Sequence, residues 1–281
     1  MLVTFARSVG TRDAELGRVC QDGMAQRMLP DGLRRVVNAP GAWQPAALRR
    51  LSVGLFDHVS LRTDFIDAAL AEGVVAGARQ VVILGAGFDT RAYRLTCLVD
   101  CQVFEVDHPD TQAAKRIRSQ GLQPLSAALQ RVACDFHDGE LTRVLGQAGF
   151  DAQRPSVWIW EGVTMYLREQ AVRDTLDAIA QLSAAGSMLI SSYVRPELAS
   201  GGPLWGRVGS AVLSAVAEPV HFVCSPATYE RLLGEHGFAV TRDVTAEERA
   251  AERGVRLLRL RACMPQESFN VARRDAPSRS E

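Results

Sequence analysis

The chain has 281 residues, of which 47% are hydrophobic, and its 32 basic and 32 acidic side chains give a formal net charge of zero. That length suffices for one large α/β domain with a substantial core, and the neutral charge argues against a nucleic-acid or anionic-membrane partner, because such partners select a strongly basic surface. Six cysteines without a C-x-x-C pair, no signal-peptide core and no run of about 18 uncharged apolar residues predict reduced thiols in a cytoplasmic protein, with neither export nor a membrane span.

The first part of the chain predicts a helical cap. Residues 11–70 show helical periodicity interrupted at three prolines, and we assign residues 1–75 to helices that precede the main part of the domain. This segment ends in LRTDFIDAAL, residues 61–70, where Arg62 lies off the apolar helical face. Because a helical arginine is ordinarily a solvated surface charge, Arg62 becomes a candidate site residue only through the motifs that follow.

A glycine turn after a buried strand is the centre of the pattern. In QVVILGAGFDTRAYRL, residues 80–95, four consecutive apolar residues predict a strand buried on both faces, and a helix is expected after the turn with Asp89 or Thr90 as its cap. Gly85 and Gly87 have no Cβ, so a ligand can lie directly against the backbone there. An ordinary strand-to-helix turn is the alternative explanation of a lone G-x-G motif.

The second predicted strand, CQVFEVD at residues 101–107, ends on an acid. Asp107 lies 20 residues after Gly87, where nucleotide-binding α/β folds place a carboxylate that accepts hydrogen bonds from ribose hydroxyls. The alternative role is a helix N-cap, since Pro109 opens a helical segment, and one carboxylate can serve both roles.

The third and fourth predicted strands end on acids as well. LQRVACDF closes on Asp135 and Phe136, which suit an adenine ring, because a carboxylate accepts from the exocyclic amine and a phenyl ring covers the base. A loop acid beside a core phenylalanine is the alternative. The apolar run at residues 157–160 closes on Glu161, and a positively charged ligand group would supply the partner that a buried acid needs.

The rest of the chain continues the alternation of helix and strand. A helix at residues 168–183 and a strand in SMLISSYV precede residues 195–225, whose glycine, serine and proline content indicates a lid-like insertion, with a plain connection as the alternative. A capped helix in SPATYERLLGEHGF, a strand in FAVTRDV and a last strand in VRLLRLRAC complete a single domain over residues 1–264. Residues 265–281 are polar and are predicted to be a disordered tail.

This order of elements predicts an α/β fold with a doubly wound, mostly parallel sheet of seven strands, in which the last strand can be antiparallel. The carboxyl ends of parallel strands meet at one edge of such a sheet, and ligands bind there. Six candidates are therefore expected to converge on one crevice: Gly85, Gly87, Asp107, Asp135, Phe136 and Glu161. Their convergence is stronger evidence for a ligand site than any single motif.

The same segments resemble a known family. LGAGFDTRAYRL, FEVDHPDTQAAKR, CDF and WEGVTMYL follow one another, preceded by RTDFID and followed by EPVHF. In this combination residues 61–238 resemble the leucine carboxyl methyltransferase family, in particular its bacterial branch of S-adenosylmethionine-dependent O-methyltransferases. The resemblance implies a class I methyltransferase fold, which is Rossmann-like, and S-adenosyl-L-methionine as the cofactor. It implies that Arg62 pairs with the methionine carboxylate, and that Gly85 and Gly87 let the methionine part pass close to the backbone.

The resemblance also implies that Asp107 holds the ribose, that Asp135 and Phe136 bind adenine, and that Glu161 faces the ammonium or sulfonium end. The chemistry of the cofactor agrees, since its carboxylate is bound well by an arginine, and its cationic amine and sulfonium are stabilised by nearby acids. A pyrophosphate instead wants a helix N-terminus free of carboxylates, and Asp89 follows the glycine turn directly. The residues therefore favour methyl transfer over a nicotinamide-dependent oxidoreductase. A protein that binds S-adenosylmethionine without turnover is the other alternative.

The acceptor is expected to be a carboxylate or hydroxyl group of a small molecule, and no catalytic residue is assigned. A carboxylate is already ionised at neutral pH and needs no base, whereas a hydroxyl would need one, for which His221, Tyr166 and Tyr193 are candidates. No metal is expected, because His108 and His137 have no ligand spacing with any cysteine. The number of subunits is left open.

Overall fold

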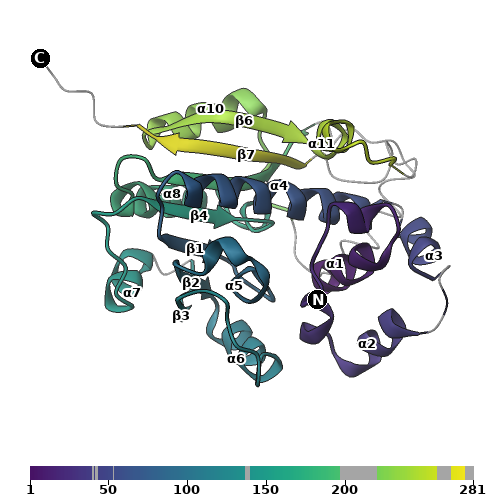
Figure 1. The fold of residues 1–281 in the computed structure, drawn as a ribbon. Coiled ribbons are helices and arrows are strands. Elements are labelled where there is room, and N and C mark those ends of the chain that lie inside the picture. The colour runs from purple at the N-terminus through teal and green to yellow at the C-terminus, as the bar shows by residue number, and fades with distance from the viewer. Residues whose placement is uncertain are drawn as a thin grey trace, which may run out of the picture.

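The computed structural model describes residues 1–39, 41, 44–52, 54–136, 140–196, 220–257 and 267–275. Within these ranges helices cover both faces of a seven-stranded sheet (Figure 1). Its strands are β1 (Gln80–Leu84), β2 (Gln102–Asp107), β3 (Ala128–Ala133), β4 (Ser156–Trp160), β5 (Met188–Val194), β6 (Phe238–Thr245) and β7 (Glu267–Arg274). The strand order is β3-β2-β1-β4-β5-β7-β6, with β1 to β5 parallel and β7 antiparallel to both of its neighbours. This sheet confirms the predicted doubly wound, mostly parallel fold.

The α-helices of the described ranges are α1 (Leu2–Arg12), α2 (Asp31–Asn38), α3 (Gln44–Leu51), α4 (Leu55–Val75), α5 (Arg91–Arg94), α6 (Pro109–Arg118), α7 (Leu141–Gln147), α8 (Glu169–Leu182), α10 (Pro226–Glu235) and α11 (Ala246–Arg253). Short 3-10 helices are η1 (Leu16–Arg18), η2 (Ala25–Met28), η3 (Thr96–Leu98) and η4 (Thr164–Tyr166). None of the described helices is both long enough and apolar enough to cross a membrane.

The sheet separates two apolar cores. On one face, α7, α8 and α10 pack over a cluster that includes Trp158 and Trp160 of β4. On the other face, α4 and α5 pack over a cluster that includes Val157 and Ile159 of the same strand. Because successive side chains of a strand point to opposite faces, the continuous apolar run of β4 supplies both cores at once. This is the burial pattern that the sequence predicts for the strand that precedes Glu161.

Helix α4 connects the first helices of the chain to the sheet. It begins directly after Gly54, whose left-handed φ of +87° suits glycine, and its 21 residues pack against β4, β5 and β7. Since α4 leads by a short connection into the start of β1, its first half lies near the carboxyl ends of the parallel strands. Helices α1, α2 and α3 gather beyond that end of α4 (Figure 1). The first half of α4 therefore lies close both to these helices and to the predicted ligand edge.

The C-terminal part of the chain differs from the prediction. Residues 255–257 of the expected last strand belong to no helix or strand, and residues 258–263 lie outside the described ranges. The last strand of the described ranges is β7, which lies within residues 265–281, where the sequence predicts a disordered tail. β7 pairs with β5 on one side and β6 on the other, and it buries Phe269 and Val271. Backbone hydrogen bonds on both sides outweigh the polar composition that suggested disorder.

The helix and strand predicted just before this region are confirmed. Ser225 caps α10 by accepting the backbone N–H of Thr228 at 3.2 Å, and FAVTRDV forms most of β6. Helix α11 follows β6 with a capping box between Thr245 and Glu248, which the sequence analysis did not identify. Of the predicted lid-like insertion, residues 197–219 lie outside the described ranges.

Candidate functional site

A cavity of about 880 Å³ opens at the carboxyl ends of the parallel strands. Its walls come from α4, from the segments that follow β1, β2, β3 and β4, and from Thr4 and Arg7 of α1. The lining includes every residue that the sequence singles out for cofactor binding: Arg62, Gly85, Gly87, Asp107, Asp135, Phe136 and Glu161. The structure therefore brings these seven residues to one place.

The glycine turn after β1 has a left-handed backbone at both glycines, with φ of +63° at Gly85 and +46° at Gly87. A Cβ on Gly85 would lie 2.3 Å from Cγ2 of Val163, so the missing side chain makes room for a neighbouring residue. A Cβ on Gly87 would meet no atom of the described residues closer than 3.9 Å. The space beside Gly87 is therefore the part of the turn that a ligand can approach.

This difference predicts unequal effects of two matched substitutions. Gly85→Ala and Gly87→Ala each place a side chain on a left-handed backbone, at a cost of about 1–2 kcal/mol. Only Gly85→Ala also forces a contact with Val163, and overpacking of this kind costs about 1–3 kcal/mol more. We expect a lower urea midpoint for Gly85→Ala than for Gly87→Ala. Equal midpoints would contradict the packing role of Gly85.

Asp107 faces the cavity from the end of β2 and is half-buried. Its Oδ2 accepts the backbone N–H of Gly87 at 2.5 Å, and its Oδ1 accepts that of His108 at 2.7 Å. The N-cap of α6 is His108, whose Nδ1 accepts the N–H of Asp110 at 3.3 Å, so Asp107 does not cap this helix. Each carboxylate oxygen has two lone pairs, and within the described residues one on each oxygen is left to accept a ligand hydroxyl.

The adenine candidates follow β3. Asp135 and Phe136 are both half-buried and both line the cavity. Phe136 also packs against the apolar cluster under α7 and α8, so one part of its ring is fixed by the core. A side chain anchored in this way can cover a flat ligand without losing much conformational freedom.

Arg62 lies in the cavity wall between two carboxylates. Its Nε donates to Oε1 of Glu161 at 2.9 Å, and its Nη1 donates to Oε1 and Oε2 of Glu267 at 3.1 and 2.8 Å. The side chain is only 7% exposed, so Arg62 is not the solvated surface charge that an isolated helical arginine suggests. Glu161 also accepts from Nη1 of Arg91 at 2.9 Å and thereby joins two buried arginines.

These charges hold one another in the ionised state. Burial by itself would raise the pKa of Glu161, but the positive charges of Arg91 and Arg62 outweigh it and hold the pKa well below its usual range. Burial by itself would lower the pKa of Arg62, and the charges of Glu267 and Glu161 raise it instead. The cavity therefore presents fixed charges of both signs at neutral pH.

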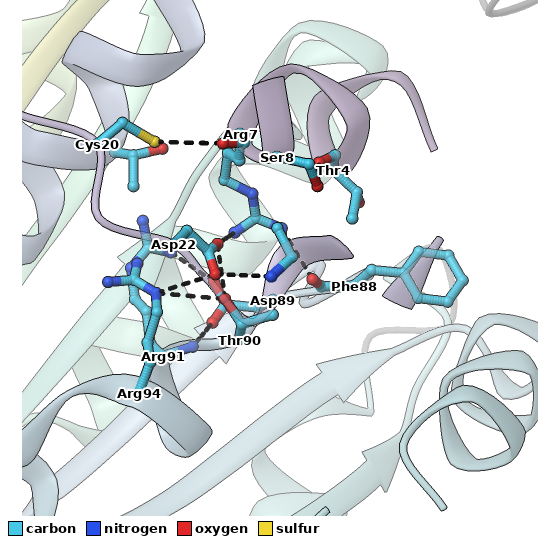
Figure 2. A network of polar contacts seen from close by, with 12 residues as sticks. Thr4, Arg7, Ser8, Cys20, Asp22, Phe88, Asp89, Thr90, Arg91 and Arg94 are labelled. Carbon is cyan, nitrogen blue, oxygen red and sulfur yellow. Dashed lines mark hydrogen bonds and ion pairs between the residues drawn. The ribbon is translucent and has the colours of Figure 1, made fainter. Parts of the chain in front are cut away.

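A second network ties α1 to the loop after β1. Asp22 lies between Arg7 and Arg94, with nitrogen–oxygen distances of 3.3 and 3.5 Å, and also accepts from Thr90 at 2.7 Å (Figure 2). Arg7 donates to the carbonyl oxygen of Phe88 at 2.8 Å. Arg7 could not be selected from the sequence, because nothing in its local pattern distinguishes it from other helical arginines.

The three candidate bases lie in different surroundings. His221 and Tyr166 line the cavity, whereas Tyr193 does not. The hydroxyl of Tyr193 donates to Asp243 at 2.5 Å, and burial together with that contact raises its pKa. A raised pKa disfavours the phenolate, so Tyr193 is not suited to remove a proton from an acceptor.

The chain is similar in sequence to known proteins. A sequence model of the leucine carboxyl methyltransferase family matches residues 1–180. A protein of Mycobacterium avium (strain 104), named "Putative S-adenosyl-L-methionine-dependent methyltransferase", is 38% identical over 211 residues, which are 70% of this chain and 65% of that protein. One of the same name from Mycobacterium marinum (strain ATCC BAA-535 / M) is 43% identical over 144 residues, 50% of this chain and 46% of that protein. The aligned part therefore spans between about half and two thirds of these curated relatives.

Two crystal structures share the fold at low sequence identity. A duf574 family protein from Streptomyces avermitilis superposes with a TM-score of 0.61 at 18% identity, covering 82% of this chain and 88% of that chain. A protein from Thermobifida fusca, named "putative methyltransferase", superposes with a TM-score of 0.59 at 17% identity, covering 83% of this chain and 89% of that chain. These likenesses confirm the α/β architecture.

Proposed function

Because its first 180 residues match that family's sequence model, the chain belongs to the leucine carboxyl methyltransferase family, and we propose that it is an S-adenosylmethionine-dependent methyltransferase. We further propose that it transfers the methyl group to a carboxylate or hydroxyl oxygen of a small molecule. The observation that carries the proposal is the set of fixed charges of both signs around an open glycine turn, all lining one cavity. The names of the mycobacterial relatives support the methyl transfer from S-adenosylmethionine, and the oxygen acceptor is the further part of the proposal.

The amino-acid end of S-adenosylmethionine fits the charged wall of the cavity. Its carboxylate would bind Arg62, whose Nη2 donates to no other group within the described chain. Its ammonium would bind Glu161, which uses two of about four acceptor positions on the two arginines beside it. The uncrowded space beside Gly87 would admit the chain between these charges and the ribose.

The adenosine end fits the residues that follow β2 and β3. Asp107 would accept hydrogen bonds from the two ribose hydroxyls, because both of its oxygens keep a free lone pair. Asp135 would accept from the adenine amine, and Phe136 would cover the ring. Asp135 and Phe136 directly follow each other in the sequence, so one loop would fix the base.

The cofactor supplies a methyl group on a sulfonium, which is a good leaving group. The residues of the chain then mainly have to align the acceptor oxygen with the methyl carbon and exclude water. A carboxylate acceptor needs no base, since it is ionised at neutral pH. For a hydroxyl acceptor, the imidazole of His221 or the phenolic oxygen of Tyr166 would take the proton, because both side chains line the cavity.

Hydride transfer from a nicotinamide cofactor fits the same cavity less well. Helix α5, which follows the glycine turn, has only four residues, and the carboxylate of Asp89 accepts the backbone N–H of its first residue, Arg91, at 2.7 Å. A diphosphate needs free N–H groups at a helix N-terminus, and here the carboxylate of Asp89 already occupies one of them.

Calorimetric titration of the purified protein with S-adenosylmethionine, S-adenosylhomocysteine and NADH tests the proposal. We expect micromolar binding of both adenosyl ligands and no binding of NADH. Methyl transfer is then measured on a panel of small carboxylic acids, phenols and alcohols. Binding of NADH alone would replace the proposal with an oxidoreductase, and adenosyl binding without transfer to any acceptor would leave a binding protein.

A further inference from the structure

Glu267, the first residue of β7, lies behind the cavity wall. Its side chain is 2% exposed and does not line the cavity, yet both of its oxygens accept from Nη1 of Arg62. Nε2 of His58 lies 2.5 Å from Oε2 of the same carboxylate. Since His58 is one helical turn before Arg62 on α4, both side chains reach the same carboxylate.

The contacts of Arg62 divide its guanidinium into a held part and a free part. Nη1 donates to Glu267 and Nε donates to Glu161, so two carboxylates fix the plane of the guanidinium from different sides. Within the described chain, Nη2 makes no hydrogen bond. Gly162 packs against the guanidinium, since a Cβ there would lie 3.4 Å from both Nη1 and Nη2. The orientation of Nη2 therefore depends on the two acids and on this close contact.

From this geometry we propose that Glu267 is a positioning residue, which holds Arg62 so that Nη2 faces the carboxylate of the cofactor. The inference rests on the proposed function and adds to it a residue that makes no contact with the ligand. Without Glu267, Arg62 would be free to pair with Glu161 through two nitrogens, because a bidentate contact is the preferred geometry of arginine with a carboxylate. That pairing would remove Nη2 from the ligand.

Glu267 can hold this position because it remains an anion. Burial by itself would raise its pKa, but the charge of Arg62 and the contacts with His58 hold the pKa at about 2. The backbone of β7 is fixed between β5 and β6. His58 in turn packs on Phe269 of β7, with ring centroids 5.4 Å apart. The positioning contact is therefore supported by the sheet itself.

The test compares two ligands that differ in the group that Arg62 is proposed to bind. S-adenosylhomocysteine carries the amino-acid part, whereas 5′-methylthioadenosine has the same adenosine and sulfur but no carboxylate. We expect Glu267→Gln to raise the dissociation constant of S-adenosylhomocysteine by roughly 10- to 100-fold, the range for one charged hydrogen bond. The constant for methylthioadenosine should change by less than about 2-fold, since the adenosine contacts are unaltered.

Two further variants separate positioning from a general loss of stability. Asp64 also lies on α4 and pairs with Arg249 at 2.6 Å and Arg253 at 3.1 Å, so Asp64→Asn removes another buried charge, one that does not touch Arg62. We expect it to leave the ratio of the two dissociation constants as in the wild type. In an Arg62→Met background, Glu267→Gln should have no further effect on that ratio, because the group that it positions is absent.

The outcomes separate this inference from the proposed function. If Glu267→Gln raised the dissociation constants of both ligands by the same factor, or changed neither, the positioning role would be overturned. The proposed function would still stand. Failure of the wild type to bind S-adenosylhomocysteine would overturn both proposals. If Glu267→Gln does not fold, Glu267→Asp is measured in its place, since its shorter carboxylate keeps the charge but cannot keep both contacts. An unchanged ratio in that variant would equally overturn the positioning role.

Discussion

Asp107→Ala is expected to weaken the binding of S-adenosylmethionine by at least about 100-fold. Two ribose hydroxyls would each lose a hydrogen bond to a carboxylate, and such charged hydrogen bonds are worth about 1.5–3 kcal/mol each. The same substitution removes the acceptor of the Gly87 N–H, which ties the glycine turn to the end of β2. Calorimetric titration of the variant with S-adenosylmethionine and S-adenosylhomocysteine measures the effect.

Controls separate the ligand contact from the contact within the protein. Asp107→Asn keeps one side-chain oxygen for the Gly87 N–H but presents an amide to the ribose, so we expect intermediate affinity and a nearly wild-type melting temperature. Asp110→Ala removes a nearby acid that is 93% exposed and does not line the cavity, and it should leave the affinity unchanged. A dissociation constant for Asp107→Ala within about threefold of the wild type would mean that Asp107 does not hold the ribose.

The sheet and the ligand edge could be predicted from the sequence, because each depends on local patterns. Buried strands have continuous apolar runs in the sequence, and the side chains of residues 157–160 pack alternately into the two cores. Glycines and acids placed directly after such runs must lie at the carboxyl edge of a parallel sheet. For this reason the cavity lining includes Gly87, Asp107 and Glu161, although they are far apart in the sequence.

Contacts between side chains from distant elements could not be predicted in this way. Glu267 meets Arg62 only because β7 is inserted between β5 and β6, a pairing that no local period encodes. The polar residues of β7, such as Ser268 and Asn270, resemble those of a solvated tail, although both are buried in the sheet. Tertiary context therefore overrides composition at this strand.

The role of Asp89 was only partly foreseen. The sequence offered it as a helix cap and as a charge that disfavours a diphosphate. In the structure its carboxylate accepts the N–H of Arg91 and also pairs with the guanidinium of that residue. The charge of Asp89 is thus matched within the protein, and Arg91, a residue that the sequence analysis did not select, becomes the centre of the buried network.

Arg91→Met should therefore cause the largest loss of stability among single substitutions at this site. Arg91 is fully buried and donates to Asp67 at 2.7 Å, to Glu161 at 2.9 Å and to Asp89. In the variant, Asp67 still pairs with Arg94, and Glu161 still pairs with Arg62. Asp89 loses the arginine to which it is hydrogen-bonded. Removing one partner of a buried ion pair costs about 3–5 kcal/mol, because the remaining charge stays out of water.

For a chain of this size such a loss lowers the melting temperature by on the order of 10 °C, which differential scanning calorimetry measures directly. The matched control is Arg143→Met, since Arg143 pairs with Glu140 at the surface and is 52% exposed. Solvent and salt screen that pair, so the control should have the same melting temperature as the wild type. If the two variants melted together, the burial of the Arg91 network would not be contributing to the stability of the fold, and the fixed charges proposed for the cofactor would lose their structural basis.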